Sequence, residues 1–275
     1  MNATITVHET SRSLTYRVAI FAYGIAAYLI GVNALLALML IMLGVFHFTG
    51  GPAGQLGLGA GLALDILLLA AFALQHSVMA RTRFKARWTR IIPAAAERST
   101  YVLATGLALA PLLVFWQPMP AIIWSVDEPI LRWLLFGTAL AGWAYMNAAS
   151  FAINHFELFG LQQVYQVLRG RPQTSAPFKE QWMYRFDRHP IMTGILIGIW
   201  VTPTMTLDHL LFAVGSTLYV WIGVHFEERS LQRQWGDVYE EYRERVGTIL
   251  PTFTSRRSKP ALVAALTSTH TEDSL

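Results

Sequence analysis

The sequence contains no cysteine. This absence excludes a disulfide, a thiolate nucleophile and a cysteine-ligated metal site. Charged residues are also scarce, at 14% of the chain, compared with about 25% in an average soluble domain. Hydrophobic residues make up 54% of the chain, and the mean hydropathy is +0.40. Together these values predict an integral membrane protein.

Several signals of other protein classes are missing. Residues 1–15 carry little positive charge and precede a very long apolar segment, which does not match a cleavable signal peptide. The histidine spacings form no compact ligand motif, so no metal site is predicted. The sequence has no nucleic-acid motif, and its basic residues follow membrane topology. We therefore expect the lipid bilayer as a partner, with no nucleic acid and no obligatory protein partner.

Apolar runs dominate the chain and predict an all-α, polytopic fold. A helix needs about 20 apolar residues to cross a bilayer. Six segments are candidates: 16–46, 56–80, 99–116, 129–153, 191–201 and 207–226. The last two form a helical hairpin around Pro203, and a C-terminal helix over 227–246 follows. We expect one membrane domain over 16–251, with mobile tails at 1–15 and 252–275.

The charges between these segments predict the orientation. Basic residues concentrate in 81–98, in 154–188 and near the C-terminus, whereas 117–128 contains no lysine or arginine. The positive-inside rule places the basic loops in the cytosol, together with both termini. The segment 81–98 is expected to lie on anionic lipid headgroups. Within the second span, Asp65 needs a polar partner, and Asn33 is one candidate.

The predicted hairpin has ionisable residues at both ends. Pro190 suits the first turn of a helix, which places His189 near the N-cap. Arg185 adds positive charge there, so this end suits a carboxylate. The other end carries Glu227 and Glu228, which point about 100° apart on a helix, so one of them is expected to face the cleft. On the residues alone, interface anchoring and a solvated helix start remain alternative interpretations.

An ordered set of residues in the last third of the chain resembles the isoprenylcysteine carboxyl methyltransferase family of membrane enzymes. The set comprises Arg188-His189-Pro190, Gly194, Glu227-Glu228-Arg229-Ser230-Leu231, Trp235-Gly236, Tyr239, Tyr242, Val246 and Leu250-Pro251. The resemblance implies S-adenosylmethionine as cofactor, bound by a cytosolic region over about 185–251. The implied cofactor-binding residues are Tyr184, Arg185, Arg188, His189, Pro190, Gly194, Glu227, Glu228 and Tyr239. Met192 departs from the pattern, because the family commonly has tyrosine there.

Three further segments resemble the bacterial branch of this family that S-methylates methanethiol. They are residues 75–81, 97–101 and 154–163. This second resemblance implies conversion of methanethiol to dimethyl sulfide at the cytosolic face of a bacterial inner membrane. A prenylcysteine-like carboxylate or a phospholipid remains open as acceptor. From a different class, a haem or electron-transfer protein with histidine ligands also remains open.

Methylation of a thiol requires loss of the thiol proton, because the thiolate is the nucleophile. With no cysteine present, a histidine or a carboxylate must take up that proton. We predict His155 as the first candidate and His76 as the second, with Glu157 orienting or tuning a histidine. Each histidine also has a plain interpretation as a satisfied interfacial residue. The small substrate cavity is expected to be lined by residues such as Trp143, Tyr145, Phe151 and Phe156.

Overall fold

The computed structural model describes residues 12–52, 54–173 and 180–249, and these are mostly helical. Among them, four helices are long and apolar enough to cross a membrane. They are α2 (Leu14–Met42), α3 (Leu58–Ala80), α5 (Glu97–Phe115, preceded by the 3-10 turn η1, Ala94–Ala96) and α10 (Leu207–Trp235). These helices confirm a membrane protein, whereas the predicted six crossings remain a prediction.

The two other predicted spans form helices of a different kind. α6 (Pro129–Ile153) has the length of a span but is not among the helices apolar enough to cross a membrane. α9 (Pro190–Trp200) has only 11 residues, well below the roughly 20 needed to cross a bilayer. The first arm of the hairpin, predicted over 191–201, is therefore short for a full span.

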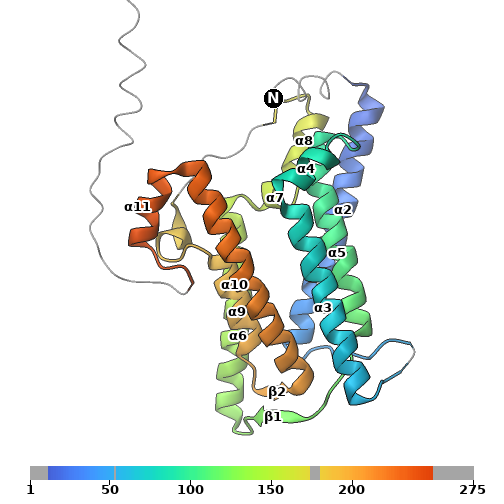
Figure 1. Ribbon diagram of the computed structural model, residues 1–275, viewed down its shortest axis with the longest axis vertical. Coiled ribbons are helices and arrows are strands. Elements are labelled where there is room, and N and C mark those ends of the chain that lie inside the picture. The colour runs from blue at the N-terminus through green and yellow to red at the C-terminus, as the bar shows by residue number, and fades with distance from the viewer. Residues whose placement is uncertain (1–11, 53, 174–179, 250–275) are drawn as a thin grey trace, which may run out of the picture.

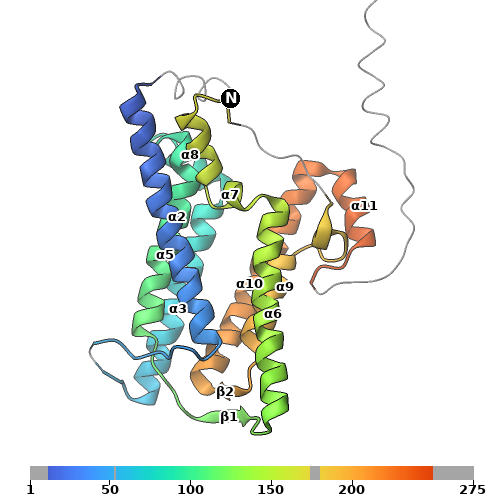
Figure 2. The same ribbon diagram turned by 180° about the vertical axis from the view of Figure 1, so that it is seen from behind.

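The long helices form two groups. Figure 1 shows α2, α3 and α5 in one group and α6, α9 and α10 in the other, and Figure 2 shows the same grouping from behind. Within the groups, α2 packs on α5 and α6 packs on α9. One end of the bundle carries α4 (Thr82–Trp88), α7 (His155–Leu158), α8 (Leu161–Leu168) and α11 (Asp237–Arg245). The elements that hold the predicted site residues therefore gather at this end.

The opposite end contains a two-stranded sheet, so the all-α prediction is wrong in this detail. β1 (Ile122–Ser125) pairs antiparallel with β2 (Thr204–Thr206), with an irregular register between Ile122 and Trp124. β-Branched and aromatic residues favour the strand conformation. Pro203 precedes β2, where its missing N–H costs no ladder bond, and its carbonyl accepts from Val126 N at 2.9 Å.

The boundary predicted between Phe226 and Glu227 is also wrong. α10 continues through both glutamates to Trp235 and ends at Gly236, whose φ of 53° and ψ of −127° break the helix. Nothing in the Glu-Glu-Arg-Ser-Leu run stops a helix, whereas glycine adopts a positive φ without steric cost. One continuous helix therefore carries the two glutamates from the apolar part of the chain.

Two smaller expectations also need correction. Ser13 caps α2, so residues 14 and 15 belong to a helix; residues 1–11 and the tail at 252–275 lie outside the described residues. Asp65 does not pair with Asn33. Instead, Asp65 Oδ1 accepts from Gln117 N at 2.8 Å, and Asn33 donates to Leu29 O within its own helix.

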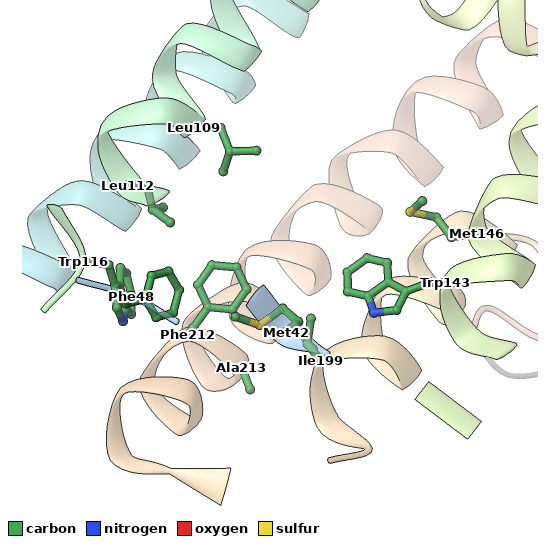
Figure 3. Close-up of a cluster of buried hydrophobic side chains, with 10 residues drawn as sticks. All are labelled: Met42, Phe48, Leu109, Leu112, Trp116, Trp143, Met146, Ile199, Phe212 and Ala213. Carbon is green, nitrogen blue, oxygen red and sulfur yellow. The ribbon is translucent and has the colours of Figure 1, made fainter. Parts of the chain in front are cut away.

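A buried apolar cluster joins the two groups of helices (Figure 3). The Trp116 and Phe212 rings meet nearly edge to face, with centroids 5.6 Å apart. The cluster consists of Met42, Phe48, Leu109, Leu112, Trp116, Trp143, Met146, Ile199, Phe212 and Ala213. Its members come from both groups, so burial of these side chains fixes α9 and α10 against the rest of the bundle.

Gly194 belongs to the tight contact between α6 and α9. A Cβ atom at this position would lie 2.6 Å from Gly142 O and 2.6 Å from Met146 N. Small residues permit such close approach between membrane helices. Packing alone therefore accounts for glycine at this position, and the cofactor contact implied by the family resemblance remains a prediction.

Gly194→Ala is expected to destabilise the protein by about 1–3 kcal/mol, because the added methyl meets backbone atoms that cannot move aside. Thermal unfolding in detergent, followed by tryptophan fluorescence, measures this change. Gly223→Ala in α10 is the matched control, since a Cβ there meets nothing within 4 Å. Equal unfolding temperatures for the two variants would contradict the packing role.

Candidate functional site

Glu228 brings the two ends of the predicted hairpin together. Its Oε1 accepts hydrogen bonds from Arg188 Nε at 2.9 Å, His189 Nε2 at 2.8 Å and Tyr239 Oη at 2.9 Å. Its Oε2 lies 3.2 Å from Arg243 Nε, an ion pair in which this nitrogen has no hydrogen-bond partner among the described residues. We call these five residues the Glu228 cluster. The cluster joins the start of α9, the end of α10 and α11.

His189 lies between two carboxylates. It is the N-cap of α9, as predicted, and Pro190 is the first helical residue. Its Nδ1 is 3.6 Å from Glu227 Oε2, on the side opposite the contact with Glu228. Burial opposes protonation of His189, but the interactions with Glu227 and Glu228 outweigh it and raise the pKa of His189 to about 9. The ring is therefore an imidazolium at neutral pH.

The two glutamates differ in exposure. The Glu228 side chain is 14% exposed and surrounded by donors, whereas the Glu227 side chain is 51% exposed. The two side chains thus lie in different surroundings, as their separation of about 100° on a helix implies, and the expectation that one of them faces a ligand cleft remains a prediction. The carboxylate that remains accessible to a ligand is that of Glu227.

Arg188 ties the chain after α11 to the start of α9. Its Nη1 donates to Arg243 O at 2.9 Å and to Val246 O at 2.8 Å, and its Nη2 donates to Thr248 Oγ1 at 2.6 Å. The Arg188 backbone N–H also donates to Gly247 O. The guanidinium therefore already has protein acceptors, which we did not predict. Arg185, by contrast, is exposed and donates weakly to Glu180 O at 3.4 Å.

Asp187 was not singled out from the sequence. Its side chain is fully buried, and its Oδ1 accepts from His189 N at 2.9 Å. Burial raises the pKa of Asp187, although hydrogen bonds from Thr193 and His189 oppose the rise. An aspartate side chain often accepts from the backbone N–H two residues later, in an Asx turn, and this preference could have identified it.

Tyrosines cover one side of the Glu228 cluster. Tyr239 and Tyr242 are buried with Val246 and pack against Leu231 and Trp235. Tyr242 Oη donates to the backbone oxygen of Tyr184 at 2.6 Å. Burial raises the pKa of Tyr184, and the charge of Glu227 adds to the rise. Tyr184 and Tyr239, both implied by the family resemblance, therefore lie beside the carboxylates as neutral phenols.

His155 lies in an aromatic enclosure at the start of α7. Its ring stacks on Phe151, with centroids 4.3 Å apart. Ser150 Oγ gives its hydrogen to Asn147 O at 2.7 Å, so it accepts from His155 Nδ1 at 2.8 Å. Nε2 then accepts from Tyr28 Oη at 3.0 Å. Burial lowers the pKa of His155, and the ring is a neutral base with a fixed tautomer.

His76 has the same arrangement in a different place. Thr105 Oγ1 gives its hydrogen to Tyr101 O, so it accepts from His76 Nδ1 at 3.1 Å. Nε2 accepts from Tyr101 Oη at 2.7 Å. Tyr101 also interacts electrostatically with Glu227. The two candidate bases thus each carry a tyrosine hydroxyl on Nε2, and this parallel was not visible in the sequence.

Two other predictions concern Glu157 and the lining of the substrate cavity. Among the described contacts, the Glu157 side chain accepts from Asn154 Nδ2 at 3.1 Å, and none joins it to His155. The residues predicted to line a substrate cavity differ in their surroundings, because Trp143 is buried in the apolar cluster, whereas Phe151 and Phe156 are 59% and 50% exposed. Their role as a cavity wall remains a prediction. Apolar character alone does not distinguish a cavity wall from core or lipid-facing surface.

Comparisons with known proteins give close relatives. A methanethiol S-methyltransferase of Mycobacterium tuberculosis is 47% identical over 207 residues, covering 75% of this chain and 83% of that protein. Methanethiol S-methyltransferase 1 of Bradyrhizobium diazoefficiens is 42% identical over 244 residues, covering 88% and 86%. Human nurim is 32% identical over 208 residues, covering 70% and 79%. No family model and no solved structure matches this chain.

These relatives confirm the resemblance that rested on the C-terminal signature and on residues 75–81, 97–101 and 154–163. Their identity exceeds 30% and extends over most of both chains. The chain therefore belongs to the methanethiol S-methyltransferase branch of the isoprenylcysteine carboxyl methyltransferase-like membrane proteins.

Proposed function

We propose that this chain transfers a methyl group from S-adenosylmethionine to methanethiol and releases dimethyl sulfide. The observation that carries the proposal is 39–47% identity to several proteins named methanethiol S-methyltransferase. In the proposed setting, the protein is a multi-pass protein of a bacterial inner membrane, and both termini and the Glu228 cluster face the cytosol. The basic helix α4 at the same end of the bundle supports this orientation through the positive-inside rule.

The residues around the Glu228 cluster fit S-adenosylmethionine, which supplies a methyl group activated by a sulfonium charge. Glu227 is the accessible carboxylate, and it suits the amino group of the cofactor. The first amides of α9, at Ile191 and Met192, have no acceptor within the helix and suit the cofactor carboxylate. We propose that Glu228 does not bind the cofactor directly. Instead it positions His189, Arg188 and Tyr239 around it.

The thiol must lose its proton as the new carbon–sulfur bond forms and the bond from the methyl group to the sulfonium breaks. We propose His155 as the proton acceptor, with Tyr28 passing the thiol proton to Nε2. His76 with Tyr101 is the competing pair, because its hydrogen bonds are the same. The protein also holds the thiol in line with the methyl group, and such positioning contributes several kcal/mol to a rate.

The alternative function, a haem or electron-transfer protein with histidine ligands, has less support than methyl transfer. Both ring nitrogens of His76 and of His155 are engaged in hydrogen bonds. The ring of His189 lies between two carboxylates. Any of these three histidines would have to give up such a contact to serve as an axial ligand. Acceptors other than methanethiol become the alternative if the protein binds S-adenosylmethionine without forming dimethyl sulfide.

The test is headspace gas chromatography of the purified protein in detergent, mixed with S-adenosylmethionine and methanethiol. S-Adenosylhomocysteine is assayed in the same samples. Dimethyl sulfide in equal amount to S-adenosylhomocysteine is the expected result. Cofactor binding without dimethyl sulfide would refute methanethiol as the acceptor while keeping the methyl donor. Folded protein that neither binds cofactor nor forms product would overturn the whole proposal.

A further inference from the structure

Arg98 is a half-buried arginine in the first turn of α5. Its Nε donates to Leu158 O at 2.7 Å, whereas Nη1 and Nη2 have no hydrogen-bond acceptor within the described part of the chain. No carboxylate among the described residues forms an ion pair with Arg98, and the adjacent Glu97 pairs with Lys85 at 3.9 Å. A cation that is partly removed from water without a counterion favours a ligand that brings negative charge.

The guanidinium of Arg98 lies between the two histidine–tyrosine pairs. Leu158, its acceptor, ends the short helix α7 that begins with His155. On the other side, Arg98 Cζ lies 5.1 Å from the centroid of the Tyr101 ring, and Tyr101 donates to His76. Arg98 therefore contacts both the helix that carries His155 and the tyrosine that is bound to His76. The charged and titratable groups that interact electrostatically with it are Lys85 of α4, His76 of α3 and Tyr101 of α5.

Contacts of the next residue fix the position of Arg98. Ser99 is fully buried, and its Oγ donates to Gly160 O at 3.1 Å. Gly160 has a φ of 84°, and a Cβ atom there would lie 2.6 Å from Ser99 N. The first turn of α5 is therefore held closely against the turn that follows α7. A charged group that is already held in place stabilises an opposite charge without the cost of reorganisation.

The proposed cofactor site lies on the Tyr101 side of this arrangement. Tyr101 interacts electrostatically with Glu227, the accessible carboxylate that suits the amino group of the cofactor. The proposed reaction forms an anion in this region, because methanethiol must ionise before its sulfur attacks the methyl group. A neighbouring arginine lowers the pKa of a thiol and so raises the fraction that is present as thiolate. A guanidinium also keeps its charge while a histidine takes up the proton.

We propose that Arg98 is a catalytic residue that binds the sulfur of methanethiolate through the hydrogens on Nη1 and Nη2. This role rests on the proposed methyl transfer and specifies how its acceptor is held. The S–H bond breaks and the proton passes to the histidine. The sulfur forms a bond to the methyl carbon as the bond from that carbon to the sulfonium breaks. The negative charge of the thiolate cancels the sulfonium charge, and Arg98 neither gains nor loses a proton.

The test measures turnover of methanethiol by the full chain in detergent between about pH 6 and about pH 10, a range that includes the ordinary pKa of a thiol. Arg98→Gln is expected to lower turnover about tenfold at neutral pH. A thiol pKa lowered by about two units raises the thiolate fraction about a hundredfold, while the thiolate becomes about tenfold less nucleophilic. The deficit should disappear toward the alkaline end, where the thiol ionises without help. An equal deficit at every pH would overturn the proposal, because loss of the contact with Leu158 alone would produce it.

Arg90→Gln is the matched control, because Arg90 is an exposed arginine soon after α4, outside the Glu228 cluster and the two histidine–tyrosine pairs. This control is expected to keep the turnover and the pH profile of the wild type. Calorimetry should show the same affinity for S-adenosylmethionine in Arg98→Gln as in the wild type. Weaker affinity would assign Arg98 to the carboxylate of the cofactor and overturn the proposal.

Arg98→Lys keeps a cation and is expected to keep the pH profile of the wild type. If Arg98→Gln does not fold, Arg98→Lys decides, because a profile shifted to alkaline pH in that variant refutes the role of Arg98. Absence of dimethyl sulfide with the wild type would refute the proposed function itself. Each of the other contrary outcomes refutes only the role of Arg98 and leaves the proposed function standing.

Discussion

Glu228→Gln is expected to lower the free energy of unfolding by about 3–5 kcal/mol, which is typical when one partner of a buried ion pair is removed. The loss follows from the side chains that Glu228 neutralises. Arg188 and the His189 imidazolium both donate to its Oε1, and they would remain buried beside a neutral amide. The same variant is expected to bind S-adenosylmethionine at least tenfold more weakly, because it frees the residues that we propose to position the cofactor.

Thermal unfolding followed by tryptophan fluorescence measures this effect, and Trp235 packs beside Tyr239 close to the change. Glu227→Gln is the control, since it removes the same charge from a neighbouring side chain that is 51% exposed. An exposed ion pair contributes no more than about 1 kcal/mol. If the two variants Glu228→Gln and Glu227→Gln have the same free energy of unfolding, the Glu228 cluster does not hold α11 in place.

His155→Gln is expected to reduce turnover of methanethiol by about 10²–10⁴, the range that general base catalysis contributes. Cofactor affinity should remain unchanged, because His155 contacts Tyr28, Ser150 and aromatic rings and none of the Glu228 cluster. The measurement combines dimethyl sulfide production with calorimetric binding of S-adenosylmethionine. Tyr28→Phe, which removes only the hydroxyl on Nε2, should lower turnover in the same direction.

The matched comparison is His76→Gln with Tyr101→Phe, since this pair has the same hydrogen bonds on another pair of helices. If His155→Gln keeps wild-type turnover while His76→Gln loses it, the base is His76. A loss in both variants with unchanged folding would mean that neither histidine alone takes up the proton. Weakened cofactor binding in His155→Gln would assign it a binding role instead.

Elements that depend on residues close together in the chain were predicted correctly from the sequence. Long apolar runs predicted the main helices, and proline after His189 predicted where α9 begins. The meeting of His189 with the Glu227 and Glu228 end followed from topology, because a hairpin returns its two ends to one side. Each of these predictions needs only composition, spacing and the direction of the chain.

Features that depend on a contact between distant residues were not predicted. Whether Arg188 faces a ligand or the protein depends on where Val246 and Thr248 lie, and this position follows from the backbone angles of Gly236. The tautomers of His155 and His76 depend on Ser150 and Thr105. The hydroxyl groups of these two residues donate to backbone carbonyl groups and therefore accept from the histidines. Neither arrangement leaves a periodic or compositional signal in the sequence.

The long reach of Arg188 has a consequence for the order of events during synthesis. Its acceptors at Arg243, Val246 and Thr248 follow it by 55, 58 and 60 residues. The chain is made from its N-terminus, so α9 and α10 are complete before these acceptors exist. A nascent chain therefore carries the membrane helices first and completes the Glu228 cluster only after Thr248 has been added. We expect products that stop short of Thr248 to insert into a membrane and yet lack this contact of Arg188.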